Sequence, residues 1–167
     1  MRTVVAILVA ASVATLAGCG GGGSDLTIRG VAGPSDVPGG ADPADVKVID
    51  AWVTTLRHGN EKAAARYFAI PSVAANPPAV VRIESLHDAV LFNESLPCGA
   101  RLVRAVDTGH GTTATFRLTE RPGPGECGAG VGTLAKTAFV IEHGKIAEWR
   151  RVPVTGGGGG GAPGQSV

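Results

Sequence analysis

The stretch that decides the fold runs from residue 98 to residue 153 and contains four strand-like segments. They read ARLVRAVD (100–107), TTATFRLTE (112–120), TLAKTAFVIE (133–142) and KIAEWRRV (145–152). The sequence TGHG (108–111) joins the first two segments, and His143-Gly144 joins the last two. Short segments joined by tight glycine-containing turns predict two β-hairpins. We therefore expect an antiparallel sheet in this part of the chain.

The first turn predicts which side chains face each other in the first hairpin. With Gly109-His110 as a two-residue turn, Val103 faces Phe116 and Ala105 faces Ala114. This face of the hairpin is apolar. The other face carries arginines and threonines, so we expect it to contact solvent.

The second turn predicts three pairs on one face: Ile141 with Ile146, Phe139 with Glu148, and Thr137 with Arg150. If this face is concave, Glu148 and Arg150 point into a pocket. Apolar surroundings raise the pKa of a carboxyl group, so Glu148 in such a pocket could act as a general base. The alternative is that Glu148 lies near the mouth or forms a structural ion pair with Arg150.

Upstream of this sheet, three residues are suited to cap helix N-termini. Asp42, Asn60 and Ser85 precede helices that we expect over residues 43–58, 61–67 and 86–96. Apolar side chains recur at helical spacing in the first of these helices: Val46, Ile49, Val53 and Leu56, with Trp52 beside them. The apolar positions of the third helix are Leu86, Val90 and Leu91.

Two prolines interrupt the chain between the second and third helices. Pro77 and Pro78 predict that residues 73–78 are irregular, because proline restricts its own backbone and that of the preceding residue. Residues 80–83 are apolar enough to form a short strand.

The composition predicts one small folded domain between glycine-rich ends. The chain has 167 residues, and much of its glycine lies in the runs 20–23 and 156–161. Only four phenylalanines, two tryptophans and one tyrosine occur, so we expect each to anchor the core. A net charge of +1 without basic clusters argues against nucleic-acid binding. The tail over residues 154–167 is expected to be disordered.

The N-terminus carries a targeting signal. Arg2 precedes an apolar run over residues 4–16, which is too short for a stable spanning helix and fits a secretory signal peptide. The next residues, LAGC (16–19), resemble the lipobox of bacterial lipoproteins. The resemblance implies a signal peptide over residues 1–18, a lipid-modified Cys19, a flexible tether over residues 19–41, and anchoring to the cell membrane outside the cytoplasm. The alternative is an ordinary cleaved signal that leaves a free thiol.

If Cys19 carries lipid, two cysteines remain. Cys98 and Cys127 are then expected to form a disulfide, because paired thiols are usual in small exported domains. The alternative is a metal or redox pair, which the lack of a CxxC spacing disfavours. The histidines also lack metal-ligand spacing, so we expect no metal and no cofactor.

Three further stretches carry a resemblance to a fold family: VIDAW (48–52), GNEKAAA (59–65) and HGKIAEW (143–149). With the order helix, short helix, strand, helix and sheet, they resemble the NTF2-like (SnoaL-like) proteins. The resemblance implies an α+β cone over residues 42–153, in which about three N-terminal helices cover a curved antiparallel sheet. In different members the concave face holds a catalytic cavity, a ligand site or only core, so the fold does not select a function.

Three hypotheses for function remain open. The residues expected around the pocket are Trp52, Tyr67, Phe116, Phe139, Ile141, Glu148 and Arg150. The first hypothesis is a non-enzymatic domain that binds a small apolar ligand or an envelope partner, because no convergent set of catalytic side chains can be placed in the pocket.

The second hypothesis is an enzyme of the isomerase, cyclase or dehydratase type that acts on a hydrophobic molecule. Tyr67 and Asp50 are the residues that the resemblance would assign to its oxyanion hole and base. The third hypothesis is a module that forms a homodimer through a sheet face carrying Ala138, Val140 and Trp149.

Overall fold

The computed structural model describes residues 40–154. The elements along the chain are α1 (Pro43–Arg57), α2 (Glu61–Ala65), β1 (Phe68–Asn76), β2 (Ala79–Ile83), α3 (Leu86–Glu94), β3 (Gly99–Asp107), β4 (Thr112–Thr119), the 3-10 helix η2 (Gly128–Gly130), β5 (Leu134–Glu142) and β6 (Lys145–Val152). The predicted signal peptide, Cys19, most of the tether and nearly all of the predicted tail lie outside the described residues. Within residues 40–154, no helix has the length and apolar character needed to cross a bilayer.

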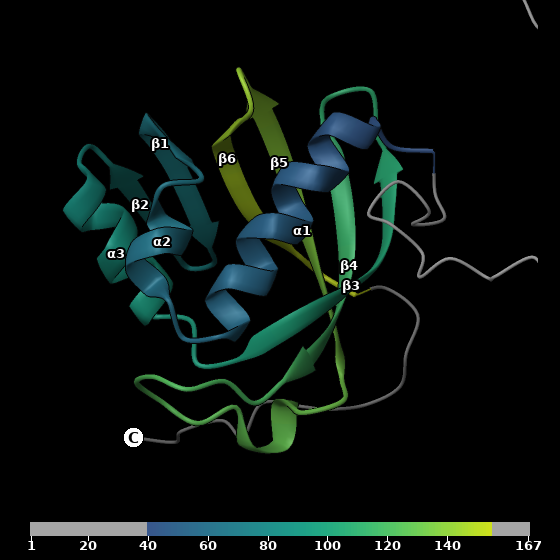
Figure 1. Cartoon of the computed structure of the whole chain (residues 1–167). Helices are drawn as coiled ribbons and strands as arrows, with labels where there is room; N and C mark the ends of the chain where they lie inside the picture. The colour runs from purple at the N-terminus through teal and green to yellow at the C-terminus, as the bar shows by residue number, and fades with distance from the viewer. Residues whose placement is uncertain (1–39, 155–167) are drawn as a thin grey trace, which may run out of the picture.

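The six strands form one curved sheet in the order β2-β1-β6-β5-β4-β3, and α1 lies across its concave face (Figure 1). The predicted α+β class, with three helices over a curved sheet, is confirmed. The sheet is mixed rather than purely antiparallel, because β1 and β6 run parallel. No tight turn sets their relative direction, since α3 and the strands β3 to β5 lie between them in the chain.

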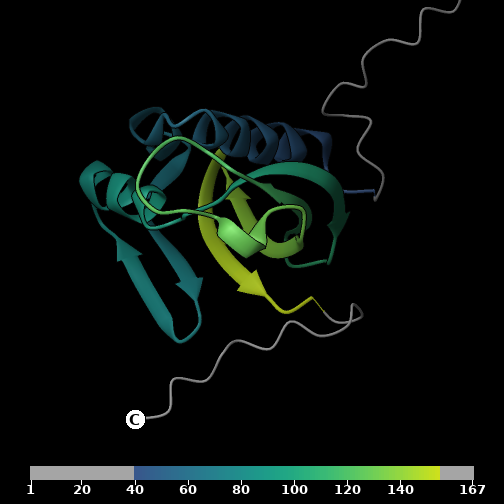
Figure 2. The same cartoon turned by 90° about the horizontal axis from the view of Figure 1, so that it is seen from below.

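The hairpin of β1 and β2 projects from the body of the domain (Figure 2). The prediction that residues 73–78 are irregular is wrong, because β1 continues to Asn76, which pairs with Ala79. Pro77 and Pro78 lie in the turn between the strands, where a missing N–H removes no hydrogen bond of the ladder. The strand predicted over residues 80–83 is confirmed as part of β2.

All three predicted helix caps are confirmed. Asp42 accepts a hydrogen bond from the Ala44 amide at 2.8 Å, and Asn60 and Ser85 make equivalent caps on α2 and α3. The buried residues of α3 are Ala89, Phe92 and Asn93. Of its apolar positions named above, Val90 packs against the core, whereas Leu86 and Leu91 are half exposed.

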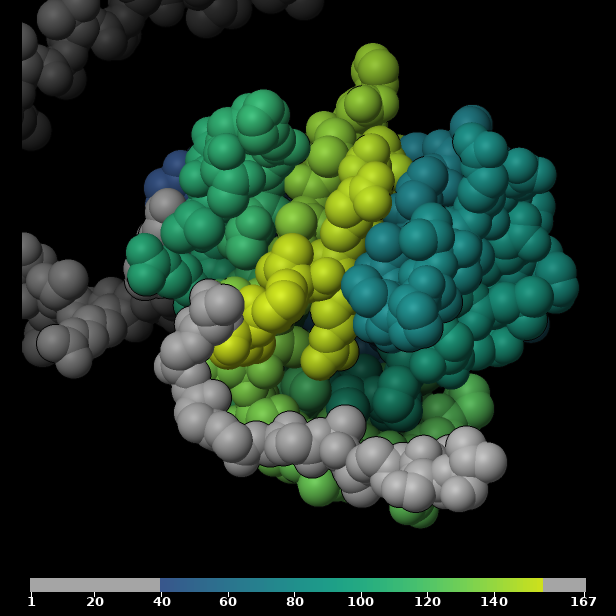
Figure 3. All heavy atoms as spheres, turned by 180° about the vertical axis from the view of Figure 1, so that it is seen from behind, coloured from purple at the N-terminus to yellow at the C-terminus, as the bar shows by residue number. Residues whose placement is uncertain are grey.

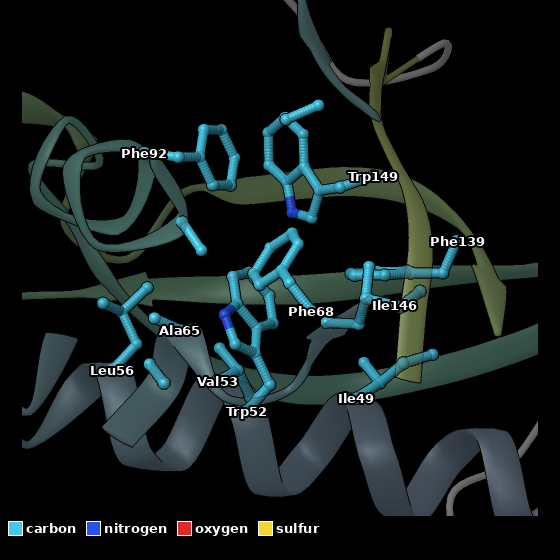
Figure 4. Close-up of a cluster of buried hydrophobic side chains, with 14 of the residues drawn as sticks. Ile49, Trp52, Val53, Leu56, Ala65, Phe68, Phe92, Phe139, Ile146 and Trp149 are labelled. Carbon is cyan, nitrogen blue, oxygen red and sulfur yellow. The ribbon is translucent and has the colours of Figure 1, made fainter. Parts of the chain in front are cut away.

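The aromatic side chains join the helices to the sheet. All four phenylalanines and both tryptophans are buried, as predicted, whereas Tyr67 is only partly buried. Figure 4 labels these buried rings except Phe116. Edge-to-face contacts link them in a chain of ring pairs: Phe116–Phe139, Phe139–Trp52, Trp52–Phe68, Phe68–Phe92 and Phe92–Trp149. Such pairs contribute beyond the area they bury, so this cluster fixes α1 and α3 against the sheet.

A β-bulge changes the predicted register of the first hairpin. The pair Ala105–Ala114 is confirmed, but Phe116 pairs with Leu102. The irregularity lies between Leu102 and Arg104. An extra residue in one strand turns the following side chains to the other face, so Val103 is exposed instead of facing Phe116.

Candidate functional site

A partly open cavity of about 80 Å³ lies between α1 and the concave face of the sheet. Its lining comes from α1, from four strands and from the segment that follows α3. The lining residues are Trp52, Val53, Leu56, Leu96, Pro97, Cys98, Ala100, Phe116, Leu118, Ala135, Thr137, Trp149 and Arg151. A mostly apolar hollow with a few polar groups is the usual form of a small-molecule site.

The pairing of β5 with β6 places the polar part of this lining. Thr137 pairs with Arg151, and Phe139 pairs with Trp149. Because side chains alternate along a strand, Trp149 and Arg151 share the concave face with Thr137. Thr137 and Trp149 are buried, whereas Arg151 is exposed at the edge of the cavity.

The indole N–H of Trp149 has no hydrogen-bond partner within the described part of the protein, although the side chain is only 4% exposed. Within residues 40–154, four buried side-chain nitrogen or oxygen atoms have no hydrogen-bond partner. Of the four residues that carry them, only Trp149 lines the cavity. Trp52, by contrast, donates its Nε1–H to Asn93 Oδ1 at 3.0 Å. Figure 4 shows the Trp149 nitrogen on the side of its ring that faces Phe68 and Trp52.

A second β-bulge overturns the register predicted for β5 and β6. His143 and Gly144 form the predicted turn, with φ values of 50° and 72°, and the pair Ile141–Ile146 is confirmed. The bulge between Val140 and Ile141 then shifts the pairs that follow. The observed pairs are Val140–Glu148, Phe139–Trp149, Ala138–Arg150 and Thr137–Arg151.

Glu148 and Arg150 therefore do not point into the cone, and their predicted place in the pocket is wrong. They lie on the convex face, where β6 runs across the middle of the molecule (Figure 3). Arg150 Nε donates to Glu148 Oε2 at 2.7 Å, and the two side chains are 48% and 38% exposed. The alternative that they form an ion pair is the arrangement observed. Trp149, predicted on the outer face with Ala138 and Val140, is instead in the core.

The other predicted pocket residues divide between three places. Trp52 and Phe116 line the cavity. Phe139 is fully buried and contacts the rings of both. Tyr67 and Ile141 border a separate, shallow groove of about 590 Å³ between α1 and the β5–β6 turn. Asp50 is absent from the cavity lining, so the acid and the tyrosine proposed for an enzyme do not meet there.

The groove beside Tyr67 contains the carboxylate of Asp45. Burial raises the pKa of Asp45, although the Thr112 hydroxyl donates a hydrogen bond to it at 3.1 Å and acts in the opposite direction. Within residues 40–154, no three His, Cys, Asp or Glu side chains are grouped to hold a metal ion.

The predicted disulfide between Cys98 and Cys127 is confirmed. It joins the segment after α3 to the loop between β4 and β5. Since Cys98 also lines the cavity, the disulfide holds one part of the cavity wall in place.

Sequence reasoning missed Trp149 and Arg151 as cavity residues. The scarcity of aromatic residues predicted a buried Trp149, whereas the regular register predicted that it faces outward. This conflict was the signal of a bulge, because one inserted residue reverses the faces of a strand.

No family model and no curated protein matches the sequence. Solved structures are similar in fold, and they include NTF2-like proteins. Bal32a from a soil-derived mobile gene cassette is 11% identical, with a TM-score of 0.50 over 65% of this chain and 88% of its own. An NTF2-like protein of unknown function from Cytophaga hutchinsonii is 11% identical, with a TM-score of 0.49 over 63% of this chain and 85% of its own.

A protein from Kribbella flavida, provisionally assigned as a ketosteroid isomerase, is 15% identical, with a TM-score of 0.46 over 68% of this chain and 82% of its own. At 11% identity, the similarity to Bal32a concerns the fold alone.

Proposed function

We propose that this protein is a membrane-anchored domain outside the cytoplasm that binds a small apolar ligand in its cone and does not act as an enzyme. The observation that carries the proposal is the lining of the cavity. Most of its side chains are apolar, and among the described residues that line it Arg151 is the only ionisable one. Apolar walls with few, separate polar groups support binding by burial of apolar surface.

The enzyme alternative has less support from this site. Isomerases, cyclases and dehydratases need an acid or base within hydrogen-bond reach of the reacting atoms. No carboxylate, histidine or tyrosine from residues 40–154 lines the cavity, and Glu148 is paired with Arg150 on the convex face. A guanidinium donates hydrogen bonds and has no acceptor, so Arg151 is a poor general base.

The anchor rests on the sequence around Cys19. A lipidated cysteine followed by Gly20–Gly23 and a long tether would hold the domain near the membrane while leaving it free to turn. We expect Cys19→Ser to move the protein from the membrane fraction to the soluble fraction and to abolish labelling by a radioactive fatty acid. Ser24→Ala, in the same segment, serves as the control. Membrane retention of the Cys19→Ser protein would contradict the anchor.

Native mass spectrometry of the full chain purified from its host tests the ligand. We expect a bound small molecule that is lost in Ala135→Leu, because Ala135 lines the cavity and a leucine there would fill it. The matched control is Ala138→Leu, three residues along the same strand on the convex face. A protein without adduct, or an adduct that survives Ala135→Leu, would contradict binding in the cone.

A further inference from the structure

The polar side chains that line the cavity are all capable of donating hydrogen bonds. They are the indoles of Trp52 and Trp149, the Thr137 hydroxyl and the Arg151 guanidinium. The Trp52 N–H already donates to Asn93, which leaves Trp149, Thr137 and Arg151. An indole and a guanidinium can only donate, and a hydroxyl can do either. The part of the chain that the structure describes contributes no carboxylate and no side-chain amide to the lining. The site is therefore complementary to a group that accepts hydrogen bonds.

These three donors lie close together on the sheet. Thr137 and Arg151 are directly opposite on neighbouring strands, which places their Cβ atoms about 5 Å apart. Trp149 lies two residues before Arg151 on the same face of β6, about 7 Å along the strand. Long side chains span such distances, so one small polar group can contact more than one of the donors.

The charge of Arg151, at the edge of the cavity, is not neutralised by any residue between 40 and 154. Neither of the two salt bridges within residues 40–154 involves Arg151. The neighbouring Arg150, on the opposite face, is paired with Glu148, and Arg121 is paired with Glu61. Arg151 thus differs from Arg121 and Arg150 in two ways: it lines the cavity, and it forms no salt bridge with a residue between 40 and 154.

The buried N–H of Trp149 adds a second, independent requirement. A buried donor without a partner lowers stability, and an acceptor on a ligand would recover that loss. A purely hydrocarbon ligand would leave this cost in place. The apolar walls around Trp52, Leu56 and Phe116 then receive the rest of the ligand.

We infer that the ligand is a short apolar carboxylate, whose oxygen atoms accept hydrogen bonds from Arg151, Thr137 and Trp149 and whose alkyl body lies against α1. This inference rests on the proposed function and specifies its ligand. The cavity, at about 80 Å³, has roughly half the volume of an engineered cavity of about 150 Å³ that holds benzene. A chain of a few carbons therefore fits, whereas a fused ring system does not.

The test compares sodium butyrate with 1-butanol, which has the same number of carbon atoms but no charge. The full chain, labelled with ¹⁵N and held in lipid nanodiscs, has two tryptophans and hence two indole N–H resonances. Trp149→Phe identifies the resonance of Trp149, and that of Trp52, already bonded to Asn93, is the internal reference. Empty nanodiscs account for binding to lipid.

We expect butyrate to move the Trp149 resonance and to bind at least about tenfold more tightly than 1-butanol, because hydrogen bonds to charged groups are the stronger class. Arg151→Gln should remove this preference, and Arg150→Gln, on the convex face, should retain it. Equal affinity for the two probes, or unchanged butyrate affinity in Arg151→Gln, would overturn the inference that the ligand is a carboxylate. The proposal that the cavity binds apolar molecules would still stand.

Failure of the proposed function and failure of this inference alone give different results. If neither probe binds and the protein from its host carries no adduct sensitive to Ala135→Leu, the proposed function fails, and the inference fails with it. If butyrate binds to the wild-type protein by calorimetry but leaves the Trp149 resonance unmoved, only the inference is overturned.

Discussion

Glu61 and Arg121, 60 residues apart in the chain, form a salt bridge with 2.5 Å between Glu61 Oε1 and Arg121 Nη1. The Arg121 side chain is fully buried, and that of Glu61 is 15% exposed. The same guanidinium donates to the carbonyl oxygens of Asn93 and Leu96 at the end of α3. Positive charge is favoured at a helix C-terminus, so Arg121 joins α2 and α3 to the loop that contains Cys127.

We expect Glu61→Gln to lower the free energy of unfolding by about 3 kcal/mol, because it leaves a buried guanidinium without its counter-charge. Arg121→Met should cause a loss of similar size, since the carbonyl oxygens of Asn93 and Leu96 lose their donor. The double variant should lose less than the sum, because neither charge then remains buried alone.

Urea unfolding of the wild-type protein, the two single variants and the double variant measures the coupling between Glu61 and Arg121. Glu94→Gln is the matched control, because Glu94 is exposed near the same end of α3 and should change stability by no more than about 0.5 kcal/mol. Strictly additive losses in the double variant would show that Glu61 and Arg121 act independently.

Local features of the sequence predicted most of the secondary structure. The caps at Asp42, Asn60 and Ser85 and the turn at His143-Gly144 depend only on neighbouring residues, so they could be read without knowledge of the fold. The parallel pairing of β1 with β6 could not, because it joins strands that are far apart in the chain. No local pattern in either strand specifies its partner.

The candidate site was predicted less well, because its position depends on a bulge. The regular register at Val140 and Ile141 placed Glu148 inside and Trp149 outside. Burying the indole of Trp149 against Phe92 instead removes a large apolar surface from water. Glu148 is then free to remain solvated beside Arg150, so both changes favour the bulged strand. Packing across the core thus outweighed regular strand pairing.

Two aspartates in the first turns of helices should respond to pH in opposite ways. Burial raises the pKa of Asp45, so its contribution to stability is present at low pH and is lost as the pH rises through the raised value. Hydrogen bonding with Ser85, together with the Glu84 amide, lowers the pKa of Asp88. Its contribution is present at higher pH and is lost as the pH falls through the lowered value.

Urea unfolding between about pH 3 and about pH 6.5 checks these signs. As the pH rises, the difference in stability between the wild-type protein and Asp45→Asn should shift against the wild-type protein. The difference between the wild-type protein and Asp88→Asn should shift in favour of the wild-type protein. The two variants are each other's control, because both replace a carboxylate by an amide in the first turn of a helix. Slopes of the same sign would contradict the prediction.

The two tryptophans should differ in their response to replacement by phenylalanine. Both are buried, so each variant loses apolar contact area. Trp52→Phe also leaves Asn93 Oδ1 without its donor in a fully buried position. Trp149→Phe strands no partner, since the Trp149 N–H has none among the described residues. We expect Trp52→Phe to be the more destabilising by about 1–3 kcal/mol.

Thermal or urea unfolding of both variants without added ligand measures this difference, and a binding assay with butyrate provides a further comparison. Trp149→Phe should weaken butyrate binding, whereas Trp52→Phe should retain the donor at Trp149. Equal destabilisation by the two replacements would indicate that the Trp149 N–H is satisfied in solution.

The disulfide should stabilise the domain mainly through the unfolded chain. It closes a loop with a sequence separation of 29 residues, for which the chain-entropy estimate is about 3.5 kcal/mol. We expect the double variant Cys98→Ala/Cys127→Ala to lose about this amount in urea unfolding, while single variants would leave a reactive thiol and are less informative. Amide hydrogen exchange should accelerate first in residues 121–133, because the disulfide holds this loop against the segment after α3. Uniform acceleration throughout the domain, with no earlier change in this loop, would contradict a local role for the disulfide in holding the cavity wall.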